Sequence, residues 1–239
     1  MPKAIGQRAD RVITHVLQGQ PDVPIVLRRS ARARRITLRV SQLDGRVTVT
    51  LPRAVPAHEA LAFAADKEPW IRKHLAARAE DVAVRIGAFV PVEGVLHELV
   101  AGAGRGVRIK TGVIVAPEQG TGARVQAVLK AQARERLATA CDHYARRLGR
   151  SYAAISLRDT RSRWGSCSSA GRLMFSWRLI LAPPDVLQYV AAHEVAHLAQ
   201  MNHSPAFWAE VTRLFGPYDT QRQWLRTKGA ALHRFRFDG

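Results

Sequence analysis

Three histidines and one glutamate in the last quarter of the chain have the residue types and the spacing of a metal-dependent hydrolase. His193 and His197 stand four residues apart in the segment His193-Glu194-Val195-Ala196-His197. On a helix, residues i and i+4 lie on one face, so both imidazoles can bind a single metal ion. Glu194 lies off that line, and it therefore fits a general base that takes a proton from a metal-activated water without ligating the metal.

This H-E-x-x-H pattern is specific. With 9 His and 9 Glu in 239 residues, chance would produce it about 0.01 times. Val186 and Val190 precede the histidines at helical spacing, so the pair continues an apolar stripe that faces the interior. Two core histidines satisfied by hydrogen bonds are the alternative, but the rarity of the motif argues against it.

A catalytic zinc site needs a third protein ligand and an open position for water. His203 is the favoured candidate, because the chain is expected to turn there. Asn202 is predicted to end the first helix in a left-handed conformation, and Ser204-Pro205 is predicted to cap the next helix. Glu210 is the competing ligand. The sequence thus predicts one zinc ion per chain, held by three imidazoles that favour zinc over other divalent ions.

The elements that must position these residues follow from the spacing of apolar side chains. Helical periodicity is found in four segments and period-two alternation in several others, with Asp44-Gly45 marking a hairpin. In that hairpin Arg35, Thr37 and Arg39 share an outward face. Helices are predicted over 56–79 with a break at Pro69, 122–148, 184–201 and 205–214, and strands over 36–40, 47–51, 90–100, 107–115, 155–157 and 173–176.

Length and composition set the broad class. The 239 residues are 47% hydrophobic, enough for an ordinary core. No stretch approaches the ~20 apolar residues of a membrane span, and no secretory signal is recognisable, so a cytoplasmic protein is predicted. Cys141 and Cys167 are interpreted as packed thiols. Three parts are predicted: a polar extension over 1–23, a β-rich part with a helix over 24–120, and a catalytic part over 121–239.

The chain carries 37 Lys and Arg against 19 Asp and Glu, a formal net charge of +18. Residues 1–53 alone hold 11 basic and 3 acidic side chains, and six of the arginines fall between Arg28 and Arg39. Such a field favours a polyanionic partner, and nucleic acid is a possible one. A GC-rich genome, which also favours arginine, would explain the same excess without any partner.

Several motifs in order resemble a known family. They are Arg163-Trp164-Gly165-Ser166-Cys167-Ser168, then Trp177-Arg178-Leu179, then the H-E-x-x-H helix, and Asn202-His203-Ser204-Pro205 followed by Phe207-Trp208. The chain resembles the YgjP-like or DUF45 family, relatives of the SprT-like zinc proteases, over residues 24–225. The resemblance implies a zincin-like α+β domain with zinc held by His193, His197 and His203 and with Glu194 as catalytic acid and base. Ser176 departs from the asparagine expected there.

The function expected from these residues is that of a zinc-dependent metallohydrolase, most specifically a metallopeptidase. The strand Leu173–Ser176 is expected to pair with an extended peptide substrate. Arg161, Arg163, Arg178 and Tyr218 are candidates for stabilising an oxyanion, with solvated surface charges the default for the arginines. Two alternatives stay open: a hydrolase of nucleotides or another phosphoanhydride, and a nucleic-acid-binding module with a structural zinc.

Overall fold

The computed structural model describes residues 13–41, 44–77 and 80–238, without the side chain of Ile13. The chain divides into two compact units, Met1–Ala79 and Glu80–Gly239, and each has a hydrophobic core of its own. This division falls at neither of the predicted boundaries, residues 23 and 120. Within the predicted extension, residues 13–17 form a strand, whereas residues 1–12 lie outside the described part of the chain.

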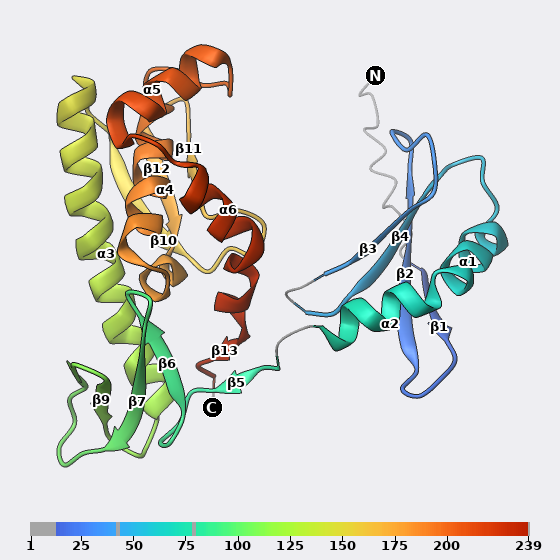
Figure 1. Cartoon of the computed structure of the whole chain (residues 1–239), viewed down its shortest axis with the longest axis horizontal. Helices are drawn as coiled ribbons and strands as arrows, with labels where there is room; N and C mark the ends of the chain where they lie inside the picture. Colours follow the sequence, from blue (N-terminus) through green and yellow to red (C-terminus); the bar gives the residue numbers. More distant parts are fainter. Residues whose placement is uncertain (1–12, 42–43, 78–79, 239) are drawn as a thin grey trace, which may run out of the picture. The chain divides into compact units, whose positions relative to one another are not determined.

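The first unit is a four-stranded sheet with two helices on one face (Figure 1). Its strand order is β1-β2-β4-β3; β2 and β4 are parallel and the other pairs antiparallel. The predicted hairpin is confirmed as β3 and β4, with Thr37 opposite Thr50. The elements are β1 (Ile13–Leu17), β2 (Val23–Ser30), β3 (Thr37–Val40), β4 (Val47–Pro52), α1 (Ala57–Asp66) and α2 (Glu68–Ala76).

The second unit begins with short strands that form hairpins. Each of the predicted strands 90–100 and 107–115 is in fact two strands, because a tight turn interrupts the apolar run. Glu93 and Gly94 take positive φ values of 50° and 81° in the first turn, and Gly112 takes 72° in the second. The elements are β5 (Val82–Ala83), β6 (Phe89–Val92), β7 (Val95–Ala101), β8 (Arg108–Lys110) and β9 (Val113–Ala116), with sheet order β6-β7-β9-β8.

Helix α3 (Thr121–Leu148) confirms the predicted helix over 122–148. Val125, Leu129, Ala133 and Leu137 recur every four residues and are fully buried, so one stripe of the helix faces the core. Gly149 ends the helix in the left-handed conformation, with φ of 72°. The buried stripe explains why so long a helix is stable despite its many arginines.

The rest of the second unit holds a three-stranded sheet and the helices that carry the candidate site (Figure 1). In this sheet, β12 lies between β10, to which it is parallel, and β11, to which it is antiparallel. No helix in the described ranges is both long enough and apolar enough to cross a membrane. The elements are β10 (Ala154–Arg158), β11 (Gly165–Cys167), β12 (Arg172–Ser176), η1 (Trp177–Leu181), α4 (Pro184–Ala196), α5 (Pro205–Phe215), α6 (Asp219–Thr227), η2 (Gly229–Arg234) and β13 (Phe235–Arg236).

Candidate metal centre

Helix α4 presents the first histidine and the glutamate of the motif. Pro184 opens the helix, where its missing N–H leaves no intrahelical bond unmade. The helix is buried over most of its surface and packs against α3, β11 and α5. It ends at Ala196, five residues before the predicted end, so His197 is its C-terminal cap residue rather than an interior one.

The chain reverses between the second and third histidines. The predicted left-handed cap at Asn202 is wrong, since Glu93 is the sole non-glycine residue with positive φ among the described residues. Instead, the Asn202 side-chain oxygen accepts a hydrogen bond from the backbone N–H of Ser204 at 3.3 Å. The predicted cap at Ser204 is confirmed, because its hydroxyl accepts from the N–H of Phe207 at 3.4 Å and Pro205 opens α5.

The turn brings the three histidines together. One ring nitrogen from each of His193, His197 and His203 lies within 4.8 Å of the other two. The Nε2 atoms of His193 and His203 are 3.1 Å apart. Two ligands of a tetrahedral zinc ion, each about 2.05 Å from the metal, are about 3.3 Å apart. The donor set and its spacing therefore fit a metal ion such as zinc.

The ring of Phe207 packs against the histidine cluster. The ring is fully buried and contacts all three imidazoles: it stacks on His197 with centroids 4.4 Å apart and meets the other two edge to face at 4.9 Å and 4.8 Å. Trp208 contacts His193 and His203 at 5.7 Å and 5.6 Å. These two aromatic rings restrict the rotation of the imidazoles. The sequence placed both residues in the helix predicted over 205–214 and gave no sign that they touch the histidines.

The surroundings keep two of the imidazoles neutral. Burial, together with the neighbouring His197, His203 and Arg222, lowers the pKa of His193 to about 3. Burial also lowers the pKa of His197, against a hydrogen bond between its Nδ1 and the Gln200 carbonyl at 2.9 Å. A proton on Nδ1 that donates to this carbonyl leaves the lone pair of Nε2 free. Metal-binding histidines are commonly oriented by such a bond.

Glu194 is 5% exposed and lies against strand β11. A Cβ atom on Gly165 would be 2.5 Å from both Cγ and Oε1 of this glutamate. Burial raises the pKa of the Glu194 carboxyl to about 8, and Arg163 opposes this rise. A carboxyl whose pKa lies near neutrality can both accept and return a proton. Cys167 on β11 is a partly buried thiol, as expected; its pKa is raised by burial and by Glu194.

The structure separates the other candidates. Glu210 forms an ion pair with Arg213 on its own helix and is not part of the histidine cluster. The sequence suggested that Arg178 is a solvated surface charge, and this is wrong. The residue is 6% exposed and binds both carboxylate oxygens of Asp159 at 2.6 Å and 3.0 Å. Because its guanidinium is engaged by Asp159, Arg178 is not available as an oxyanion donor. Arg163 lines the same hollow as Glu194.

Two hollows flank the cluster. A hollow of about 240 Å³ is lined by Trp164, Tyr189 and Leu225 together with His193, Glu194 and Arg163. Another of about 460 Å³ lies beside His197, Leu198 and Met201. Strand β11 lies beside both hollows. Gly165 lines the first, and Ser168, the residue after the strand, lines the second.

Strand β11 is also an edge strand of its sheet. The predicted substrate-pairing strand, residues 173–176, is instead the central strand β12, whose backbone is already paired on both sides. An added strand would therefore use an edge of the sheet, and β11 is the edge strand in contact with α4; its outer edge has no partner among the described strands.

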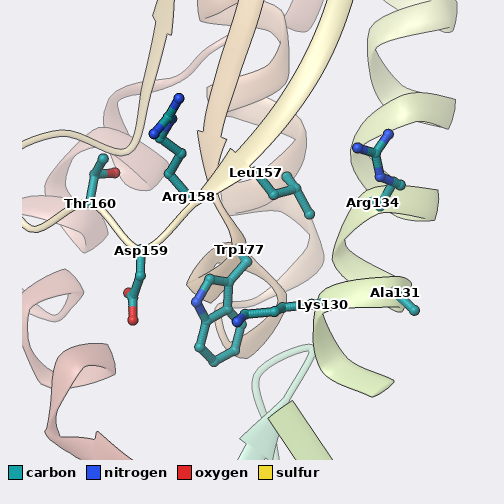
Figure 2. A pocket seen from close by; sticks show the side chains of 8 residues that line it. All are labelled: Lys130, Ala131, Arg134, Leu157, Arg158, Asp159, Thr160 and Trp177. Atoms are coloured by element: carbon teal, nitrogen blue, oxygen red, sulfur yellow. The ribbon is translucent and has the colours of Figure 1, made fainter. Parts of the chain in front are cut away.

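A larger hollow of the second unit lies elsewhere. It has a volume of about 720 Å³ and is lined by residues of α3, β10 and η1, with no histidine and no glutamate among them. In Figure 2, Lys130 lies across Trp177, while the side chains of Arg134 on the helix and Arg158 on the strand both extend toward the top of the view, away from that ring. The carboxylate of this hollow, Asp159, is bound by Arg178, so the hollow offers no catalytic constellation.

The family described as "YgjP-like, metallopeptidase domain" matches residues 34–228. No curated protein matches the chain. A crystal structure of the metallopeptidase zymogen of Pyrococcus abyssi abylysin is similar at 20% identity, with a TM-score of 0.35; the match covers 38% of this chain and 95% of that one.

Proposed function

The chain belongs to the YgjP-like metallopeptidase family, and we propose that it is a zinc-dependent peptidase with a zincin-like catalytic unit. In this proposal His193, His197 and His203 hold one zinc ion and Glu194 is the general base. One observation carries it: three imidazole nitrogens converge within 4.8 Å beside a buried glutamate.

Zinc in such a site supplies Lewis acidity, which polarises a substrate carbonyl and lowers the pKa of water. The residues of this chain do the rest. Gln200 fixes the ring of His197 through the bond to Nδ1, and Phe207 holds all three imidazoles in place. His203 is the most exposed of the three, so the cluster opens to solvent and substrate on its side.

Glu194 moves the proton. Its burial favours the protonated carboxyl, so the group readily takes a proton from water and later returns it to the leaving amine. Strand β11 restricts the position of the Glu194 carboxylate, because this side chain comes so close to Gly165 that a Cβ atom there would collide with it. Arg163, in the same hollow, is the nearest cation that acts on the charge of Glu194.

The unpaired edge of β11 supports a peptide as substrate. An extended peptide can add to this edge through main-chain hydrogen bonds, and its side chains can enter the two flanking hollows. The hollow beside Glu194 has aromatic and aliphatic walls, which favours an apolar side chain. A nucleotide would not gain the strand pairing.

The test uses the full chain with measured zinc content. Glu194→Gln is expected to retain one zinc ion and to lower kcat on peptide substrates by a factor of about 10² to 10⁴. Glu98→Gln on β7, an exposed acid outside the site, is the matched control and should keep full activity. Retained activity of Glu194→Gln, or hydrolysis that continues after zinc has been removed, would overturn the proposal.

The ligand assignment has a separate test in zinc affinity. His203→Ala is expected to weaken zinc binding by at least ~100-fold, since even loss of an outer-shell partner costs about 10- to 100-fold. Glu210→Ala should leave zinc binding unchanged, because Glu210 is engaged by Arg213. The opposite pattern would make Glu210 the third ligand.

A further inference from the structure

Within the described part of the first unit, no helix or strand covers one face of its sheet. On β2 and β4, Val23, Ile25, Leu27, Val47, Val49 and Leu51 are buried and form the core with α1 and α2. Because side chains alternate along a strand, the intervening residues point to the opposite face. Figure 1 shows both helices on a single side of this sheet.

Arginine and threonine dominate that outer face. In the strand register, Arg28 of β2 lies beside Thr50 of β4, which lies opposite Thr37 of β3. In the next row, Arg39 of β3 lies opposite Thr48. Arg28 and Arg39 are both exposed, and the Arg28 guanidinium donates to the Thr50 hydroxyl at 3.4 Å. Guanidinium and hydroxyl donors thus lie side by side on neighbouring strands about 4.8 Å apart, with Val26 of β2 beside Thr48 in the second row.

Charge is segregated between the two sides of this unit. No acidic residue occurs between Asp22 and Asp44, whereas Glu59, Asp66 and Glu68 all lie on the helices. The connection from β2 to β3 adds exposed arginines at the end of the same face. Arg29 does not belong to the face, since it points inward and donates to two carbonyls of the segment before α1. We define the basic face as Arg28, Arg32, Arg34, Arg35 and Arg39.

From this placement we propose that the basic face binds the phosphodiester backbone of double-stranded nucleic acid. Guanidinium and hydroxyl groups are the side-chain donors that contact phosphate oxygens most often. Within the described part of this unit, the large aromatic residues Phe63 and Trp70 lie on the helices, so the sheet face offers no ring for stacking on bases. The chemistry therefore suits backbone contacts, which do not depend on sequence and do not need unpaired bases.

The proposal is tested by binding of a short, labelled DNA duplex to the full chain at several salt concentrations. Binding is expected to weaken steeply from about 50 to about 200 mM salt. In the double variant Arg28→Gln/Arg39→Gln, the negative slope of log affinity against log salt should become shallower by about 1.8, because each lost phosphate contact removes about 0.9 from its magnitude. The affinity should fall about tenfold or more.

A matched variant separates a local site from the general charge of +18. Arg108→Gln/Lys110→Gln removes the same two charges from β8, where both side chains are exposed and lie in the other unit. This control should bind DNA as the wild type does, and unchanged thermal unfolding and zinc content confirm that both variants are folded. Equal weakening by the two pairs would overturn the proposal, as would the absence of any DNA binding at low salt.

Two further probes decide the class of partner. Single-stranded DNA of the same length is expected to bind more weakly than the duplex, since stacking is not available. Poly-glutamate is expected to bind weakly and with no dependence on Arg28 and Arg39. If poly-glutamate binds as tightly as the duplex and responds to the same variant, the face is a site for acidic protein and the proposal is wrong.

Discussion

At the residue scale, the Glu194 side chain fits beside strand β11 because residue 165 is glycine and has no side chain. A side chain there would meet Cγ and Oε1 of the glutamate at 2.5 Å, a distance that real Cβ contacts do not show. Glu194 is buried, so it has little room in which to move away. The glycine therefore allows strand β11 and the candidate base to lie in direct contact.

Gly165→Ala is expected to displace the Glu194 carboxyl while leaving the histidine cluster intact. Catalysis depends on placing the proton acceptor to within a fraction of an ångström, so kcat/KM on a peptide should fall about 10- to 100-fold. Zinc content should be unchanged, because the three atoms nearest to the added Cβ all belong to Glu194 and none belongs to an imidazole. Gly106→Ala, where a Cβ meets nothing within 4 Å, is the control. A Gly165→Ala variant with normal kinetics would contradict the close contact.

The central residues of the site could be predicted from spacing alone. The four-residue step from His193 to His197, and the proline-led turn after His203, follow from helix geometry and from local capping rules. The contacts of Phe207 with three imidazoles, and of Gly165 with Glu194, could not be predicted, since each joins segments whose approach depends on the tertiary fold. Burial of Arg178 has the same origin: only the fold brings its partner Asp159 and the η2 carbonyls to it.

At the element scale, a polar network ties the end of β10 to the 3-10 helices η1 and η2. Arg178 of η1 binds Asp159, which follows β10, and donates to the carbonyls of Leu232 and Phe235 at 3.0 Å. His233 of η2 lies within this network, 4% exposed, with its ring 5.3 Å from that of Trp164. Trp164 lines the hollow beside Glu194. The C-terminal segment thereby supports one wall of the candidate site.

The buried His233 predicts a loss of stability in acid. Burial, and then Arg178, lower its pKa to about 4 from the ordinary 6.5; Asp159 opposes the change, and Arg161 and Arg236 add to it. The unfolded chain thus binds the proton first, so stability is complete above pH 6.5 and falls as the pH decreases toward 4. The maximum loss is about 3 kcal/mol. Urea unfolding at several pH values measures it.

His233→Phe is the comparison for this experiment, because it keeps a ring against Trp164 and removes the titrating group. The variant should show a shallower decrease in the free energy of unfolding between pH 6.5 and 4. Both proteins are measured with chelator present, since protonation of the zinc ligands would otherwise add its own pH dependence. If the free energy of unfolding depended on pH identically in the two proteins, protonation of His233 would not be a cause of the loss of stability.

Element prediction from the sequence succeeded where one apolar stripe continues over many residues, as in α3 with Leu129 and Leu137. It failed where a short turn is embedded in an apolar run, as at Glu93-Gly94, because alternation continues through the turn. Strand β11 was missed because three residues are too few to show a period. Helix α6 was missed because only Trp224 and Leu225 are apolar among its nine residues, and none of the nine is buried.

At the scale of the whole molecule, the chain consists of two units with separate cores and unequal charge density. Residues 1–79 carry 15 basic and 6 acidic side chains, and residues 80–239 carry 22 and 13. The net charge is therefore the same in both units, although the first is half as long. The candidate metal centre belongs entirely to the second unit and the basic face entirely to the first. The two proposed functions can thus be tested independently of each other.

Separate cores also predict separate unfolding transitions. Ile71 of α2 is fully buried in the first core, so Ile71→Ala should destabilise the first unit by about 2–5 kcal/mol and leave the second unchanged. Zinc bound as proposed by the histidine cluster should stabilise only the second unit, by about 4 kcal/mol when its concentration is about 1,000 times Kd. Calorimetry of the full chain should resolve two transitions, with Ile71→Ala lowering one and chelation lowering the other. A single transition that both changes lower would mean that the two units unfold as one cooperative body.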